Sequence, residues 1–350
     1  RLEAVIVFQN TQMKAEPRQE QLEEIIYLFS DGNFEAASAH AEKLLGSFPD
    51  SFDCINLLAT VNSACGRLDV AKELFSKAEA INPSFAPMLA NFGDLLFKLG
   101  DFQRAEATLT RALDIDTKNS SALNNLGNIN AAQEDHQTAI KFFEKAERFN
   151  LRNSDAPLLN WARSLLAVGE ATNGKAKLEE FSSKYRPTAD SEIIWGSLEL
   201  SDGNLAGALK HFENAAALDG SYGLAHYNLG LTNLLMEKSE PAVRHFEKAK
   251  ATGYASPELF RNLGIAYQIE GFNRLAADVF RKAIELDSEN PELIASWCEN
   301  LRLSDGYKIE HWKELRGAIQ KHPECYPLHL TSCLFSNYTD LLRSEVFSYH

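Results

Sequence analysis

Asparagine recurs at one place of a periodic pattern in this sequence, at intervals of 34 or 35 residues or twice 34. A side-chain amide offers two hydrogen-bond donors and one acceptor, so a row of amides can pair with an extended peptide backbone whatever its side chains are. Asparagine is also a poor helix former, and keeping it in a helix interior costs some tenths of a kcal/mol per residue. The alternative is chance variation, or a local bond to the preceding turn. The recurring residues are Asn91, Asn125, Asn160, Asn228 and Asn262.

Neighbouring places on the same expected helix face change character along the chain. In the amino-terminal half they are polar or charged: Asp94, Lys98, Asn128 and Arg163. In the carboxyl-terminal half they are apolar: Leu231, Leu234, Leu235, Ile265 and Ile269. We expect Asp94, Asn128 and Arg163 to share a peptide-binding groove with the five asparagines. The apolar end predicts either a docking surface for a partner or following domain, or plain burial between repeats.

The sequence contains few motifs that could bind a metal or carry catalysis. His322, Cys325, His329 and Cys333 are zinc-ligand residue types, but Pro323 and Pro327 interrupt them and the spacing fits no structural zinc pattern, which favours coincidence. There is no glycine-rich phosphate loop, no G-x-S-x-G and no H-E-x-x-H. We therefore predict no catalytic residue, no metal and no cofactor in this chain. The histidines at 40, 136, 211, 245 and 311 are expected at the surface.

Composition limits the class of partner. The 350 residues are 45% hydrophobic, which suffices for a substantial core, and the formal charge of −14 argues against nucleic acid as the main ligand. No apolar run reaches the roughly 18 residues of a membrane span, so we expect no membrane partner. Five cysteines without a CxxC pair indicate reduced, buried thiols and a cytoplasmic location, with disulfides as the alternative.

The elements that position the asparagines follow from a repeat. Glycines before short polar turns fall into one register, and the resulting units begin at residues 18, 52, 86, 120, 155, 189, 223 and 257. Small residues recur in both halves of a unit, which lets paired helices approach closely, and bulky residues fill the space toward the next unit. Gly127 is such a packing residue. Residues 1–17 precede the repeats, 18–290 form eight units, and 291–324 form a degenerate ninth unit or cap.

The repeating residues resemble the tetratricopeptide family. The eighth unit carries the resemblance best, with Leu263, Gly264, Tyr267, Ala276 and Phe280 at the places of its pattern L-G-x2-Y and A-x3-F. This resemblance implies an all-α fold, a right-handed superhelix of stacked antiparallel helix pairs, or α-solenoid. It also implies that proteins or extended peptides bind in the concave groove.

Residues 329–350 resemble the segment that joins repeats to the catalytic domain in bacterial proteins of the O-linked N-acetylglucosamine transferase-like family. The matching residues are His329, Asn337, Tyr338, Asp340, Leu341, Glu345, Val346, Phe347 and His350. In that family an asparagine row holds the protein substrate, and residues 325–350 would begin a linker to a catalytic domain beyond residue 350. Two hypotheses follow: the recognition arm of a longer glycosyltransferase, or a non-enzymatic scaffold or the arm of another fused transferase.

Overall fold

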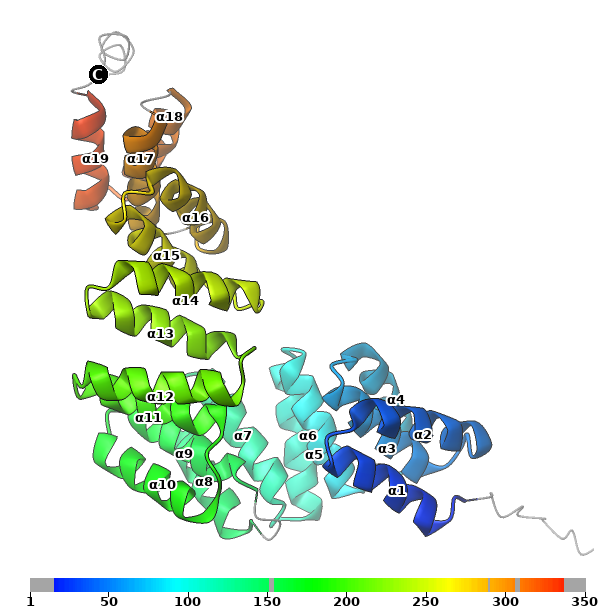
Figure 1. Ribbon diagram of the computed structural model, residues 1–350. Coiled ribbons are helices and arrows are strands. Elements are labelled where there is room, and N and C mark those ends of the chain that lie inside the picture. Colours follow the sequence, from blue (N-terminus) through cyan, green and yellow to red (C-terminus); the bar gives the residue numbers. More distant parts are fainter. Residues whose placement is uncertain (1–15, 151–153, 289, 306–308, 337–350) are drawn as a thin grey trace, which may run out of the picture. The chain divides into compact units, whose positions relative to one another are not determined.

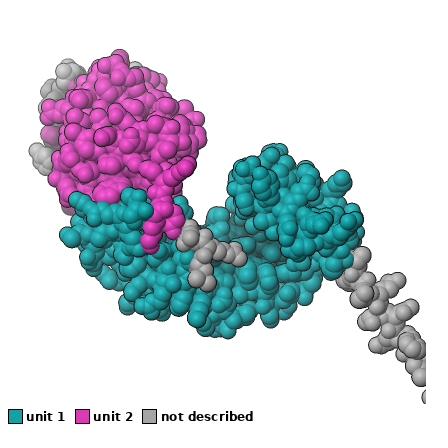
Figure 2. Space-filling model, turned by 60° about the horizontal axis from the view of Figure 1, so that its bottom comes forward, with its two compact units in different colours: residues 1–183 teal, residues 184–350 magenta. Residues whose placement is uncertain are grey.

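The computed structural model describes residues 16–150, 154–288, 290–305 and 309–336, and these residues form α-helices joined by short turns (Figure 1). The chain divides into two compact units, residues 1–183 and 184–350 (Figure 2). The first contains α1 (Gln19–Ser30), α2 (Phe34–Ser47), α3 (Phe52–Ala64), α4 (Leu68–Ile81), α5 (Ala86–Lys98), α6 (Phe102–Ile115), α7 (Ser120–Ala132), α8 (His136–Arg148), α9 (Ala156–Ala167) and α10 (Ala171–Lys184). The last residue of α10, Lys184, is the first residue of the second unit. The second contains α11 (Ala189–Ser201), α12 (Leu205–Leu218), α13 (Gly223–Leu235), α14 (Ser239–Ala251), α15 (Pro257–Ile269), α16 (Asn273–Leu286), α17 (Pro291–Asp305), α18 (Ile309–Lys321) and α19 (Tyr326–Ser336).

Several helices begin at a side-chain cap that precedes an apolar stripe of helical period. In α6 the side chain of Asp101 accepts a hydrogen bond from the Arg104 amide at 3.3 Å, which satisfies one of the otherwise unpaired amides of the first turn. Ala105, Leu109 and Ala112 follow at spacings of a helical turn, and all three are fully buried. The predicted all-α architecture of antiparallel helix pairs is confirmed.

The turn between the two helices of a pair requires a left-handed backbone conformation. Six pairs place a glycine there, with φ between +75° and +80°: Gly32, Gly66, Gly100, Gly169, Gly203 and Gly271. Two pairs instead place Glu134 (φ 64°) and Glu237 (φ 59°) at this position. A side chain with a Cβ is strained in this region, so these two turns carry a conformational cost that the glycine turns avoid.

Pairing is close because a glycine in the first helix faces a bulky residue in the second. A Cβ at Gly127 would lie 2.4 Å from the Phe143 ring, and the same relation holds for Gly196 with Phe212. The rings therefore lie over the glycine of their own pair. Phe75 also reaches the next pair and stacks on Phe92 with 5.5 Å between ring centroids.

Successive pairs stack within each unit. In the first unit α8 packs against α9, and the first helices α5 and α7 also contact each other directly. In the second unit α12 packs against α13 and α14 against α15, while α19 packs against both α17 and α18. Residues 337–350 of the predicted linker lie outside the described residues. Among the helices that the structure describes, none combines the length and apolar character needed to cross a membrane.

Candidate functional site

A cleft with a volume of about 470 Å³ lies on the first helices α5 and α7, at the start of α9. We call it the asparagine cleft. The turn that precedes α7 and the residues Phe149, Asn150 and Ser154 near the start of α9 form its rim. Its lining residues are Pro87, Ala90, Asn91, Asp94, Asp116, Lys118, Asn119, Ser120, Ser121, Asn124, Asn125, Phe149, Asn150, Ser154 and Pro157. The cleft is in the size range of small-ligand and peptide sites, and it brings together Asn91, Asn125 and Asp94, three of the residues predicted from sequence.

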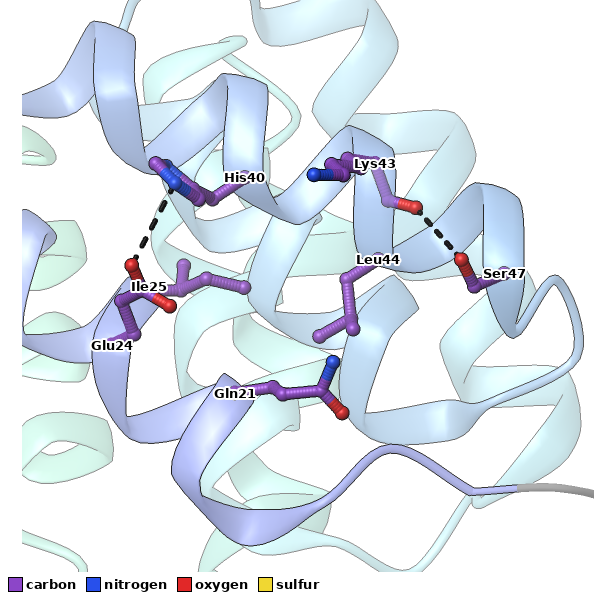
Figure 3. A pocket seen from close by; sticks show the side chains of 7 residues that line it. All are labelled: Gln21, Glu24, Ile25, His40, Lys43, Leu44 and Ser47. Carbon is purple, nitrogen blue, oxygen red and sulfur yellow. Dashed lines mark hydrogen bonds and ion pairs between the residues drawn. The ribbon is translucent and has the colours of Figure 1, made fainter.

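A second pocket, between α1 and α2, is much smaller, at about 140 Å³ (Figure 3). Ile25 and Leu44 line it beside several polar groups, some of which have partners. Glu24 lies 3.7 Å from the His40 ring, and the Ser47 hydroxyl donates to the backbone carbonyl of the preceding turn (Figure 3). This pocket has room for a few water molecules, and we do not assign it a ligand.

The cleft asparagines donate their amide hydrogens to the preceding repeat. Asn91 Nδ2 donates to the Thr60 hydroxyl at 3.4 Å, and Asn125 Nδ2 donates to the carbonyl oxygen of Ala90 at 3.4 Å. Asn160 Nδ2 donates to Asn124 Oδ1 at 3.1 Å. Each bond joins a first helix to the first helix one repeat earlier. The donors of the row therefore tie repeats together, a role that the sequence did not predict.

The side-chain oxygens of these asparagines form fewer hydrogen bonds than their amide nitrogens. Within the described residues no donor contacts Asn91 Oδ1, and Asn125 Oδ1 accepts only a long 3.5 Å bond from Asn124. Asp94 forms an ion pair with Lys98 at 2.7 Å. The inner wall of the cleft thus presents half-buried amide oxygens and a carboxylate, which are suited to accept hydrogen bonds from peptide N–H groups.

The rim of the cleft combines apolar and polar groups. The Lys118 ammonium lies 6.0 Å from the centroid of the Phe149 ring, within cation–π distance. Asp116 caps its turn by accepting from the Lys118 amide at 3.1 Å, and Asn150 Oδ1 accepts from the Ser154 amide at 2.9 Å. The Asp116 bond fixes the turn before α7, and the Asn150 bond ties Asn150 to Ser154 beside the start of α9.

Other predicted residues lie outside the cleft lining. Asn160 and the exposed Arg163 contact each other on α9 at 3.5 Å, and Asn128 is half-buried on α7. Asn228 and Asn262 lie in the second unit. Asn262 was expected on an open groove but is buried, and its amide donates to the Tyr227 hydroxyl at 3.1 Å, because the bulky tyrosine of the preceding repeat covers it.

One cleft residue was missed by the sequence analysis. Asn124 lies outside the register of the row, yet it is buried, lines the cleft and bonds both Asn125 and Asn160. Asn56, two repeats earlier, occupies the equivalent place. That recurrence was the signal available in the sequence.

The apolar residues of the second unit divide into two classes. Leu231, Leu234 and Ile265 pack partly against the core, as the burial alternative predicts. Leu235 and Ile269, by contrast, are 53% and 61% exposed. The burial alternative therefore holds for the first three residues, and a docking surface stays a prediction for Leu235 and Ile269.

The histidines expected at the surface are also divided. His40 is exposed, but His211 is half-buried and pairs with the buried Glu192 at 2.8 Å, while His245 stacks on His226 with 6.0 Å between centroids. Both second helices press these rings onto the first helix of their pair, which the sequence pattern did not reveal. His322 lies 4.0 Å from Glu324, and the described side chains contain no cluster of His, Cys, Asp or Glu that could hold a metal ion. The Cys333 side chain lies outside the described residues.

Comparison with known proteins finds one family model and one curated relative that are similar to parts of this chain. The tetratricopeptide repeat model matches residues 91–153, which include most of the lining of the asparagine cleft. The chain is 23% identical over 321 residues to Protein CTR9 homolog of Arabidopsis thaliana, of which it spans 29% of the length.

Solved structures show the same fold. The Cut9–Hcn1 hetero-tetramer of the APC/C is similar with a TM-score of 0.65 and 15% identity, over 87% of this chain and 58% of that one. A tetratricopeptide repeat protein from Parabacteroides merdae ATCC 43184 is similar with a TM-score of 0.55 and 18% identity, over 71% of this chain and 97% of that one. The family model matches residues 91–153, and these structures show that the chain shares the helical solenoid fold of tetratricopeptide repeat proteins.

Proposed function

We propose that this chain is a protein-binding scaffold that holds an extended segment of a partner protein in the asparagine cleft. The observation that carries the proposal is the lining of the cleft. Asn91 and Asn125 use their amide hydrogens within the fold, while their oxygens are left with weak partners or none. An extended peptide presents N–H groups at regular intervals, and such groups would complete these acceptors.

The cleft also suits an uncharged backbone better than a terminal carboxylate. Its charged lining residues are Asp94, Asp116 and Lys118, and Asp94 already has a cation in Lys98. The two carboxylates are thus balanced by two cations, which leaves no excess positive charge to hold a carboxylate ligand, whereas backbone amides meet acceptors at the correct polarity. Pro87, Pro157 and Phe149 supply apolar contacts that do not depend on the ligand's sequence.

Photo-crosslinking can first identify the ligand. A benzophenone side chain at Ser121, an exposed residue of the cleft lining, should crosslink to a segment of a partner protein, which mass spectrometry then defines as a synthetic peptide. A matched probe at the exposed Thr110, on the second helix α6 and outside the cleft lining, should not give this crosslink.

Calorimetry with that peptide then tests the asparagines. The double variant Asn91→Ala/Asn125→Ala should weaken binding by about 0.5–1.5 kcal/mol for each hydrogen bond that is lost. The control Asn173→Ala, on α10 and outside the cleft, should bind like the wild type. Equal affinity for the wild type and the double variant would refute the role of the row.

A more specific proposal is that the chain is the recognition arm of a longer glycosyltransferase. It rests on the resemblance of residues 329–350, of which 337–350 lie outside the described residues. Reading the coding sequence past residue 350 tests it, because a catalytic domain there supports the recognition-arm hypothesis and a stop codon removes it. A cytoplasmic location is in turn compatible with the free thiols of Cys54, Cys65, Cys298 and Cys325, and cell fractionation is its test.

A further inference from the structure

Two consecutive helix pairs of the second unit bury ionisable side chains where most other repeats are apolar. The place lies near the start of each first helix, and it carries Glu192 on α11 and His226 on α13, which are 8% and 2% exposed. The equivalent residues on five other first helices are Ile55, Leu89, Leu123, Leu158 and Phe260. Burying an ionisable group is costly unless it is paired, so each of the two positions depends on what the second helix places opposite it.

In α11–α12 the buried carboxylate has partners on the second helix. Glu192 Oε2 accepts from His211 Nδ1 at 2.8 Å and from Asn214 Nδ2 at 3.1 Å. The Trp195 ring stacks on His211 with 6.0 Å between centroids. A proton taken up by His211 would therefore face a carboxylate, and its charge would be compensated inside the helix pair.

In α13–α14 an imidazole takes the place of this carboxylate. His226 occupies the position of Glu192 and His245 that of His211, 34 residues later in each case. The two rings stack with 6.0 Å between centroids and 18° between planes. His226 Nε2 donates to the carbonyl oxygen of Gly220 at 3.2 Å, whereas its buried Nδ1 has no hydrogen-bond partner in the described part of the chain. A neutral ring with its hydrogen on Nε2 satisfies this geometry.

The charged groups that act on the two rings are cations of α14. Lys248 acts on both rings and Arg244 on His245, so burial and these positive charges together lower the pKa of both histidines. The other ionisable groups of the packed elements bond or act on other residues, and they are Glu240 and Glu247 of α14, Glu192 of α11, His211 of α12, Asp219 of the turn before α13, and Glu258 and Arg261 of α15.

The two rings also lie beside the contact that closes the helix pair. His226 lies one turn before Gly230 on the same face of α13, and His245 directly precedes Phe246. A Cβ at Gly230 would lie 2.5 Å from the Phe246 ring, so α13 and α14 have no spare room here. Repulsion between two charged rings would therefore act where the two helices are packed most tightly.

We propose that the pair α13–α14, residues 223–251, is a section of the second unit that opens in acid. A proton on His226 would be a buried charge without a carboxylate, and it would give Nδ1 a hydrogen without an acceptor. Water hydrates both imidazolium rings once the pair opens, so proton uptake favours the open form.

Opening of this section would interrupt the second unit. Helix α12 packs against α13, and α14 packs against α15, so the section connects α11–α12 to α15–α16 (Figure 1). The section lies outside the asparagine cleft. Its test and the test of the proposed scaffold function can therefore fail separately.

Hydrogen–deuterium exchange of the full chain with mass spectrometry tests the proposal, at pH 7.5 and 5.5, with labelling times scaled to the intrinsic exchange rate. Because the pKa of both rings is lowered in the closed pair, the open pair binds protons first as the pH falls below about 6.5. Each ring can then favour opening by up to about tenfold at pH 5.5. We expect the protection of α13 and α14 to fall by about tenfold or more, and that of α5–α8 by less than about threefold.

Two variants remove the proposed cause in different ways. His226→Glu restores the carboxylate–imidazole arrangement of α11–α12, and it should keep α13 and α14 protected at pH 5.5. His226→Leu/His245→Leu should do the same without any charge, because Ile55 and Leu74 are buried at the equivalent places of α3–α4. The matched control His40→Gln replaces an exposed histidine of α2 and should behave like the wild type. Circular dichroism at pH 7.5 establishes that each protein is folded.

Three results would overturn the proposal. The first is a protection of α13 and α14 that changes between the two pH values no more than that of the first unit. The second is equal acid-induced loss of protection in the wild type and in His226→Leu/His245→Leu, which would mean that other groups cause it. The third is a folded His226→Glu protein that opens in acid like the wild type, because the missing carboxylate would then be irrelevant. If His226→Glu does not fold, the double leucine variant decides the test.

Discussion

Replacing Gly127 by leucine tests the packing that defines each helix pair. A Cβ at this position would lie 2.4 Å from Cε1 and 2.7 Å from Cδ1 of Phe143, where carbon atoms normally stay about 3.5–4.0 Å apart. The ring is 1% exposed, so it has no free space to enter. We expect overpacking to destabilise the protein by about 1–3 kcal/mol, less a helix-propensity gain of about 0.8 kcal/mol. The matched control is Gly46→Leu on α2, where a Cβ meets nothing within 4 Å.

A second substitution makes this test specific. Phe143→Ala alone should cost about 3–5 kcal/mol through the cavity that it leaves. In the double variant Gly127→Leu/Phe143→Ala the new leucine fills that cavity. The first pair of the chain already uses this exchange, with Ile25 and Ala41 buried at the equivalent places.

Urea unfolding followed by circular dichroism measures the coupling. We expect the double variant to be more stable than the sum of the single variants by about 2 kcal/mol or more. Because the stability of each solenoid unit depends on its contacts with the neighbouring units, the single variants should also lower the cooperativity of the unfolding transition. Strict additivity of the two substitutions would refute the assignment of Gly127 and Phe143 as partners.

Three further predictions concern turns, histidines and thiols. Glu134→Gly and Glu237→Gly should each stabilise the protein by up to about 1 kcal/mol. The left-handed conformation costs a residue with a Cβ about 1–2 kcal/mol, and the larger conformational entropy that glycine loses on folding offsets part of the gain. An unchanged melting temperature would contradict the strain. Burial lowers the pKa of His226 and of His245 below the ordinary value near 6.5, so the unfolded chain binds protons first and stability should fall as the pH drops below about 6.5; replacing both rings with glutamine should flatten the melting temperature between pH 7.5 and 5.5. Burial raises the pKa of the Cys298 thiol to about 12, so this thiol should be alkylated only on unfolding; rapid labelling of the Cys298 peptide in the native protein, detected by mass spectrometry, would contradict its burial.

The sequence by itself determined the repeat and the pairing within it. Gly127 and Phe143 stand 16 residues apart, as do Gly264 and Phe280, because each helix pair must bring a small and a large residue together. Such contacts are local in the chain, and their period of 34 residues makes them visible without coordinates. The place of Asn91 and Asn125 on a common face could be predicted for the same reason.

The tertiary structure decided which of these residues are available. Asn125 and Asn262 are equivalent in sequence, yet Asn262 is buried under Tyr227, while Asn125 lines a cleft next to the smaller Ala90. In each case the deciding neighbour belongs to the preceding repeat, about 35 residues away, and its size varies while the pattern stays constant. The exposure of Leu235 beside the half-buried Leu231 depends in the same way on how neighbouring helices pack. Periodicity fixes the direction of a side chain, but packing between repeats decides whether a ligand can reach it.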